Sequence, residues 1–351
     1  TRYTLKDGAH FSREFIIMLL AIFLGIIAAL FLSYFDYQVY TKFWPVIAVF
    51  CVIIMLVLFK WGTGPSSRPD ARTWLSIGPI NFQPSELVKI GFIITFGVHL
   101  DKVKEKINNI FSILQLGAHA AVPIVLVAAT GDMGSALVFM VIAIVMMFVA
   151  GVHWGYFLGG IALVGAATPL IWTYVLKQLQ KDRFLALIYP DLYPDIIYQQ
   201  QRGLNAIGAG GITGQGLFKG AYTQAGAVPE SQNDMIFSVV GEELGFIGCI
   251  TALLLIVLIT VRIIYVGKKS SEQSTNLICT GMAAMIIGQM IINVGMCLML
   301  LPVIGITLPF FSAGGSSNLC VYLGIGIVMS IYRHNCDTGA VNIRVYDSLK
   351  K

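Results

Sequence analysis

Asp234 lies where a long polar stretch of this sequence turns into an apolar one. The apolar residues 235–237 follow it directly, and Glu242 and Glu243 come about two helical turns further on. A carboxylate at such a boundary is partly desolvated, which makes it a better proton acceptor than a fully hydrated one. Asp234 is therefore the first candidate for a general base. Its position also permits a plainer role, in which Asp234 and Asn233 cap the helix that follows.

A second set of charges lies in the segment FQPSELVKI. Pro84 suits the first turn of a helix, and Glu86 and Lys89 are three residues apart, hence on one helix face. Ionisable residues within a membrane span are costly and by default mark a functional interior. The alternative is a structural ion pair that holds two spans together. Asp132, in GDMGSALV, begins a further apolar run, where it would serve as a site residue or as a helix cap.

The largest polar stretch, residues 177–235, is long for a connection without a function. It carries Lys181, Arg183 and Arg202, followed by the glycine-dense AIGAGGITGQGLFKG at residues 206–220. Glycines let backbone N–H groups approach an anion closely, and basic side chains add charge, so this stretch could hold a diphosphate. The alternative is a flexible loop with a half-inserted helix.

Residues 301–317, LPVIGITLPFFSAGGSS, combine two prolines, several glycines and a serine cluster at membrane depth. Irregular backbone is tolerated there only where it is buried in protein or lines a wet cavity. We therefore expect a re-entrant or broken-helix segment that faces a cavity.

The composition defines the elements that must position these residues. With 57% hydrophobic and 12% charged residues, the chain departs far from soluble domains, in which about a quarter of residues are charged. Apolar runs of about 20 residues fit helices rather than barrel strands. We expect an all-α polytopic membrane protein, a single domain over residues 1–351, with nine spans. The spans are residues 14–33, 44–61, 84–100, 112–129, 133–151, 154–176, 236–266, 275–300 and 318–332.

Several classes of site and partner are not indicated. The net charge of +5 is modest and no basic block is interleaved with aromatic residues, so we expect no nucleic-acid partner. Neither a CxxC pair nor HExxH spacing occurs among the cysteines and histidines, so neither a disulfide framework nor a zinc site is expected. No inverted repeat of the kind found in many transporters is visible.

The charges of the loops set the expected orientation. Nine spans place the two termini on opposite sides of the membrane, and basic residues at 101–106, at 262–269 and in the C-terminal tail fall on one side. We assign that side to the cytoplasm, which puts residues 1–13 and the stretch 177–235 outside. The first run is long enough to span and lacks the cleavage site of a signal peptide.

Three segments, FQPSELVKI, PESQNDMIFSVVGEELGFIG and LPVIGITLPFFSAGGSS, closely resemble the signature segments of the SEDS proteins of shape, elongation, division and sporulation, the RodA and FtsW family. The order and spacing of these segments match those of the family. GDMGSALV and AIGAGG fall where the family has similar short motifs, and the resemblance covers essentially the whole chain. It implies a ten-span fold in which the first run here corresponds to the family's second span. Because the sequence also begins without Met, we expect the family's first span to be missing from this chain.

The resemblance implies a peptidoglycan glycosyltransferase that polymerises lipid II with inversion, releases undecaprenyl diphosphate and uses Asp234 as general base. The substrate-binding or cavity residues that it implies are Glu86, Lys89, Arg72, Asp132, Arg183, Arg202, Lys219, Ser312, Ser316 and Ser317. The basic residues among them, or a bound divalent cation such as Mg²⁺ or Mn²⁺, would stabilise the departing diphosphate, and no organic cofactor is expected. Implied partners are a class B penicillin-binding protein and the cell-shape or division machinery, at a bacterial cell membrane with the catalytic stretch outside.

The chain departs from the family pattern at Gln232 and Asn233, where His-Thr is common, at GDMG in place of PDLG, and at Ala313 in place of a frequent Tyr. These departures remove no ionisable group named above, but they leave the subfamily open. A flippase of lipid-linked precursors is the alternative function, because a transporter also needs a polar cavity and intramembrane charges. Glu86 and Lys89 would then matter more than Asp234. A non-catalytic scaffold is the third interpretation.

Overall fold

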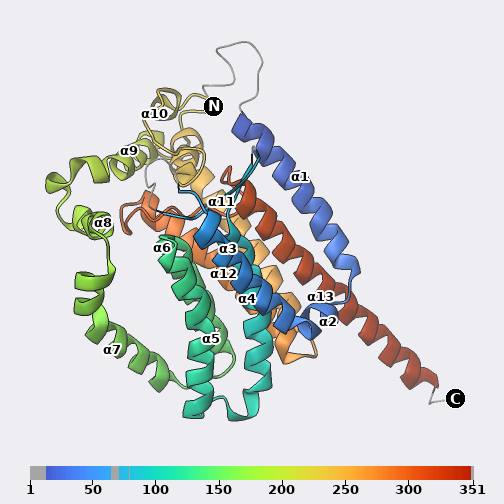
Figure 1. The fold of residues 1–351 in the computed structure, drawn as a ribbon. Helices are drawn as coiled ribbons and strands as arrows, with labels where there is room; N and C mark the ends of the chain where they lie inside the picture. Colours follow the sequence, from blue (N-terminus) through green and yellow to red (C-terminus); the bar gives the residue numbers. More distant parts are fainter. Residues whose placement is uncertain (1–12, 65–70, 79, 349–351) are drawn as a thin grey trace. The chain divides into compact units, whose positions relative to one another are not determined.

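The computed structural model describes residues 13–64, 71–78 and 80–348, and the predicted location of residues 1–12 therefore lies outside the described residues. Each of the nine predicted apolar runs coincides with a helix (Figure 1). These helices are α1 (Arg13–Tyr34), α3 (Trp44–Trp61), α4 (Pro84–Lys102), α5 (Ile110–Ala129), α6 (Met133–Val149), α7 (Trp154–Leu170, continued by a π-helical turn, Ile171–Val175), α11 (Ile236–Lys268), α12 (Gln273–Cys297) and α13 (Gly315–Ser348).

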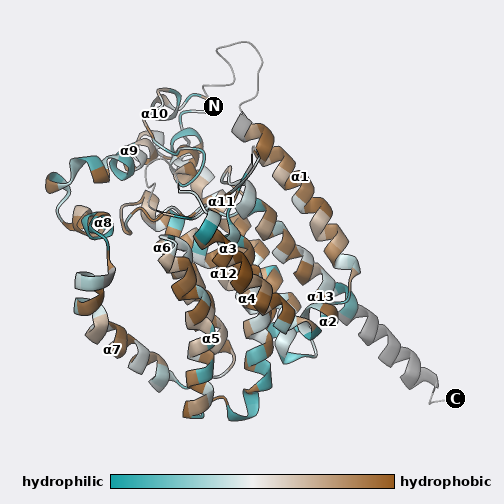
Figure 2. Ribbon diagram, viewed as in Figure 1, coloured by the Kyte–Doolittle hydropathy of each residue, from teal (hydrophilic) through white to brown (hydrophobic). Residues whose placement is uncertain are grey.

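In the described part of the chain, seven helices are long and apolar enough to cross a membrane. They are α1, α3, α5, α7, α11, α12 and α13. Helix α6 is shorter, with 17 residues, and α4 carries charges at both of its ends. Figure 2 shows hydrophobic residues along α1, α5 and α6, and more hydrophilic ones around α9 and α10. The all-α membrane class is confirmed, with one addition, a two-stranded hairpin of β1 (Leu75–Ile77) and β2 (Ile80–Phe82) just before α4.

The chain divides into two compact units. The bundle unit contains Ile17–Gly151, Val257–Gly288 and the described residues from Gly314 on. The loop unit contains Val152–Ile256, Gln289–Ala313 and the described residues up to Ile16. Helices α11 and α12 each contribute one part to each unit.

Helix α4 forms the core of the bundle unit. Most of its residues are buried, including Ile93 and Phe96, which are 0% exposed. It packs against α3, α5, α6 and α13. Small residues let helices approach closely here, as membrane helices often require. Gly91 of α4 faces Cys51 of α3, and a Cβ atom on Gly326 of α13 would lie 2.7 Å from the Cα of Ala29 on α1.

The stretch 177–235 of the loop unit is largely helical. It contains α8 (Gln178–Ile188), a 3-10 turn (Pro190–Leu192), α9 (Pro194–Gly210) and the short α10 (Ala221–Gln224). Helices α8 and α9 pack against each other. Helices therefore make up much of this stretch, while residues 211–220 of its glycine-dense part form turns and irregular backbone.

Helix α11 is two helices joined by a break at Gly245. This residue has φ 68° and ψ −166°, a conformation in which glycine avoids the penalty of a side chain. The glycine-dense loop packs at the break, because a Cβ atom on Gly245 would collide with the backbone of Ile212 and Gly214. The apolar run predicted as one span is thus divided nine residues after its start at Ile236.

The predicted broken-helix segment is confirmed between α12 and α13, where no regular helix forms from Leu298 to Gly314. Its residues Pro302, Ile306, Leu308 and Pro309 are buried. Irregular backbone at this depth needs protein partners, and side chains of the loop unit supply several of them.

Candidate functional site

Asp234 lies in the turn directly before α11 and is half-buried, while the next residue, Met235, is 0% exposed. Its backbone carbonyl accepts a hydrogen bond of 2.8 Å from Nδ2 of Asn293 on α12. The same amide nitrogen donates to the carbonyl of Ile306 at 2.7 Å. Asn293 therefore joins the Asp234 turn to the broken-helix segment and fixes the backbone from which the candidate base projects.

Ser312 makes a second connection between these two sequence motifs. Its hydroxyl donates to the carbonyl of Asn233 at 2.8 Å and accepts the N–H of Leu308 at 2.8 Å. The N–H of Ala313 donates to the carbonyl of Gln232 at 2.8 Å. The structure thus brings Ser312 to the residues beside Asp234, through backbone contacts.

The basic residues of the loop unit lie in different environments. Arg183 of α8 donates to the carbonyl of Val303 at 2.7 Å, so it supports the broken-helix segment. Arg202 of α9 is half-buried and lies 5.1 Å from the ring centre of Tyr198. Lys219 is exposed, in the glycine-dense loop.

Several backbone N–H groups of the glycine-dense loop donate to acceptors of the protein itself. Gln215 and Gly216 donate to the carbonyls of Glu242 and Glu243, each at 3.0 Å. The N–H of Phe218 donates to the Glu243 carboxylate at 3.0 Å. These three N–H groups therefore bind two carbonyls and one carboxylate of α11. Binding of a diphosphate by the rest of the glycine-dense stretch stays a prediction.

In the bundle unit, Glu86 and Lys89 form an ion pair of 2.8 Å. Both side chains are buried, with Lys89 0% and Glu86 5% exposed. The pair lies within one helix, α4, so the alternative of a pair that joins two spans does not describe this contact. Each charge neutralises the other in an apolar environment, where a lone charge would be costly.

Asp132 is the N-cap of α6, which confirms the capping alternative. Its Oδ1 accepts the N–H of Ser135 at 3.0 Å. Its Oδ2 accepts from Nε2 of Gln83 at 2.8 Å and from the hydroxyl of Ser85 at 3.0 Å. The hydroxyl of Ser316 in turn accepts the N–H of Gln83 at 3.1 Å. Three predicted motifs, FQPSE, GDMGS and the serine cluster, therefore meet in one hydrogen-bonded network in the bundle unit.

Arg72 and Ser317 complete the predicted set, and both belong to the bundle unit. Arg72 is exposed, and its guanidinium donates to the carbonyl of Phe59 at the end of α3. Its N–H donates to the carbonyl of Thr130 at 2.8 Å. Ser317 is 6% exposed in the first turn of α13.

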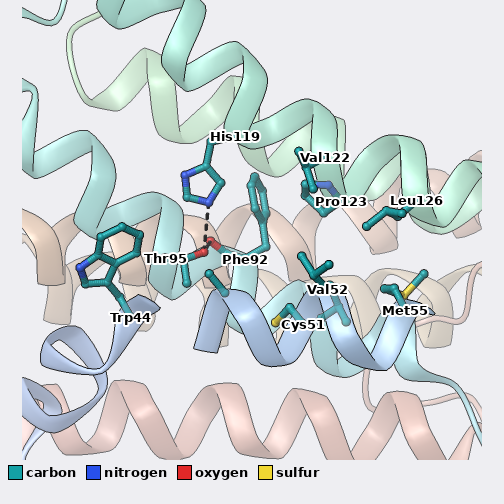
Figure 3. Close-up of a pocket in the computed structure, with 12 residues that line it drawn as sticks. Trp44, Cys51, Val52, Met55, Phe92, Thr95, His119, Val122, Pro123 and Leu126 are labelled. Carbon is teal, nitrogen blue, oxygen red and sulfur yellow. Dashed lines mark hydrogen bonds between the residues drawn. The ribbon is translucent and has the colours of Figure 1, made fainter. Parts of the chain in front are cut away.

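An apolar pocket of about 270 Å³ lies elsewhere in the bundle unit, between α3, α4 and α5 (Figure 3). Its wall includes Thr95 and His119, whose side chains approach to 3.3 Å. None of the predicted site residues lines it. Among the residues that the structure describes, no group of three or more His, Cys, Asp or Glu side chains could hold a metal ion.

Sequence reasoning missed the amide side chains that hold the loop unit together. Nε2 of Gln200 donates to the carbonyls of Met296 and Leu301 at 2.8 and 2.7 Å, and Asn293 acts in the same way. A signal existed for Asn293, because it lies one helical turn after Gln289 within an otherwise apolar run. Amides at such spacing in a membrane helix usually find partners on other helices or segments.

The long apolar helices, together with a buried ion pair and polar networks at the helix ends, define a multi-pass helical membrane protein. The sequence matches a family described as "Cell cycle protein", the family of FtsW, RodA and SpoVE, over residues 3–337. The chain belongs to this family.

Individual relatives agree with this assignment. The chain is 28% identical to peptidoglycan glycosyltransferase MrdB of Escherichia coli strain K12, over 89% of this chain and 83% of the relative. It is 31% identical to stage V sporulation protein E of Bacillus subtilis strain 168, over 95% of this chain and 90% of the relative. A chain from a solved structure of a peptidoglycan synthase complex, described as coordinating polymerization and crosslinking, superimposes with a TM-score of 0.79 at 26% identity. That similarity covers 95% of this chain and 94% of the other.

Proposed function

We propose that this protein is a peptidoglycan glycosyltransferase that polymerises lipid II and releases undecaprenyl diphosphate. The names of its relatives support the reaction class. The observation that carries the assignment is the Asp234 turn, which Asn293 and Ser312 fix from two other segments at the boundary of an apolar helix. A base held in this way can accept a proton without first having to be ordered.

Asp234 acts as the general base in this proposal. A sugar hydroxyl is a poor nucleophile, and a positioned carboxylate that accepts its proton makes it a better one. The activated oxygen attacks the anomeric carbon in line, with inversion, and the bond from that carbon to the diphosphate breaks. The proton ends on Asp234 and the electron pair leaves with the diphosphate.

Positive side chains stabilise the departing diphosphate, so no protein acid has to protonate it. Lys219 is the candidate for direct contact because its side chain is exposed in the loop. Arg202 is a second candidate, and Arg183 contributes through its support of the broken-helix segment. The predicted residues of the bundle unit remain proposed substrate-binding residues, and none of them takes part in a chemical step. They include Glu86, Lys89 and Arg72.

A divalent cation has no step in this mechanism. The described residues do not gather the three or more ligands that a protein-built metal site would use. Mg²⁺ or Mn²⁺ therefore stays a prediction, to be tested by adding EDTA to the polymerisation reaction.

The partner and the location follow from the same proposal. We propose that the protein works beside a class B penicillin-binding protein, since a similar chain was solved in a complex that couples polymerization to crosslinking. The stretch 177–235 and Asp234 face the outside of the cytoplasmic membrane, where lipid II is polymerised.

The deciding experiment incubates the purified protein and a class B penicillin-binding protein with lipid II, and separates glycan strands by gel electrophoresis. Glycan product supports the proposal. In parallel, liposomes with labelled lipid II test the flippase alternative. Movement of lipid II across the bilayer without glycan product would replace the proposed function by transport.

A further inference from the structure

Glu242 binds the loop that precedes α11 through both of its carboxylate oxygens. Its side chain is 0% exposed. Oε1 accepts the N–H of Tyr222 at 2.6 Å. Oε2 accepts the N–H of Thr223 at 2.9 Å and the hydroxyl of the same residue at 2.5 Å. Hydrogen bonds to an ionised acceptor are short and strong, so this carboxylate fixes α10 at its first turn.

The neighbouring carboxylate, Glu243, holds the same loop on either side of that point. Its Oε2 accepts the N–H of Phe218 at 3.0 Å, and its Oε1 lies 3.4 Å from Nε2 of Gln224. Glu243 thus contacts both ends of the segment from residue 218 to residue 224, and Glu242 binds Tyr222 and Thr223 within it. We call this segment the anchored loop.

The backbone of the anchored loop is shaped to fit the two carboxylates. A Cβ atom on Gly220 would lie 2.7 Å from Oε2 of Glu242, so a side chain at this position would displace the carboxylate from its present place. Phe218 has a φ of 60°, which is uncommon for a bulky residue and persists only where its surroundings fix it. The hydrogen bond from its N–H to Glu243 supplies that constraint.

Lys219 lies between the two anchoring points. Its N–H donates to the carbonyl of Gly216 at 3.0 Å, which closes a turn, and its side chain is exposed. We infer that Glu242 and Glu243 are positioning residues, which hold the anchored loop so that the Lys219 ammonium meets the diphosphate of a polyprenyl-linked sugar. This inference rests on the proposed function, because the diphosphate is the leaving group of that reaction.

Trypsin tests the anchoring without any need for activity. The full chain in lipid nanodiscs is digested, and cleavage after Lys219 is compared with cleavage after Lys181 in the same molecule. We expect Glu242→Gln and Gly220→Ala each to accelerate cleavage after Lys219 about tenfold or more, because hydrogen bonds to a charged acceptor are lost. Cleavage after Lys181 should stay unchanged.

Gly208→Ala is the matched control, because a Cβ atom at this position of α9 would meet no described atom within 4 Å. Trypsin should cleave this variant after Lys219 at the same rate as the wild type. Glu243→Gln provides a milder variant if Glu242→Gln does not fold, since it leaves the Glu242 anchor in place. Unchanged cleavage after Lys219 in Gly220→Ala and in the folded glutamate variants would overturn the anchoring.

A double-mutant cycle tests whether Glu242 acts through Lys219. In the polymerisation assay, Lys219→Ala and Glu242→Gln should each lower kcat, and the double variant should be no slower than Lys219→Ala alone. Fully additive losses would mean that Glu242 does not act through Lys219. If the wild type forms no glycan, the proposed function fails, while the trypsin result still decides whether the glutamates anchor the loop.

Discussion

The side-chain amide of Asn293 donates a hydrogen bond of 2.8 Å to the backbone carbonyl of Asp234, 59 residues earlier in the chain. The same nitrogen reaches the carbonyl of Ile306 at 2.7 Å. One buried amide thus connects a membrane helix, the turn that carries the candidate base and the broken-helix segment. The orientation of Asp234 depends on this amide rather than on helix geometry alone.

Asn293→Leu, which keeps the side-chain volume and removes both hydrogen bonds, should destabilise the protein. Each buried carbonyl that is left unpaired costs about 1–3 kcal/mol, so the free energy of unfolding in detergent should fall by at least that amount. Glycan synthesis should fall as well. Asn108→Leu is the control, because Asn108 donates to the carbonyl of Gly151 at an exposed position. Equal stability of the two variants would contradict the role given to Asn293.

Glu86→Gln should destabilise the bundle unit, because it leaves the Lys89 charge buried and uncompensated. Removal of one partner of a buried ion pair costs about 3–5 kcal/mol. The double variant Glu86→Gln with Lys89→Met should recover most of that loss.

The exposed pair of Lys104 and Asp101, 3.1 Å apart, provides the comparison. Asp101→Asn should change the free energy of unfolding by less than about 1 kcal/mol, since solvent screens this pair. Both sets of variants can be measured by chemical unfolding in detergent. If Glu86→Gln lowers the free energy of unfolding no more than Asp101→Asn does, the buried ion pair contributes no more to stability than the exposed one.

Asp132→Ala should lower stability by about 1–3 kcal/mol, because Gln83, Ser85 and the N–H of Ser135 all lose their acceptor. Asp132→Asn still offers one oxygen as a cap and should lose less. Asp36→Ala removes a single exposed cap of α2 (Tyr37–Lys42) and should lose least. Thermal unfolding of the three variants would reveal the order, and a different order would argue against the network as the main role of Asp132.

The sequence predicts the helices of this protein well, because the thickness of the bilayer dictates the length of an apolar run. It also identifies the broken-helix segment, since prolines and glycines at membrane depth interrupt a helix. The break at Gly245 was not predictable in this way, because no proline marks it and the apolar residues Leu244 and Phe246 flank it directly. Its cause is a tertiary contact with Ile212 and Gly214, which no local pattern contains.

In the candidate site, too, the sequence indicates some features, while others depend on tertiary contacts. The ionisable residues Asp234, Glu86 and Lys89 stand out in the sequence because charges are rare near apolar spans. The sequence does not reveal what Glu242 and Glu243 bind, since their main partners are backbone N–H groups of the anchored loop. One of these glycines, Gly220, lies against the side chains of Glu242 and Glu243.

The most direct test of the central claim is the polymerisation of lipid II by Asp234→Asn. The amide keeps the size of the side chain but does not accept a proton from a sugar hydroxyl. General base catalysis contributes about 10²–10⁴-fold, so glycan synthesis should fall by at least about 100-fold at unchanged thermal stability. Asp195→Asn, at the exposed start of α9, should polymerise like the wild type. Wild-type glycan synthesis by Asp234→Asn would contradict the account.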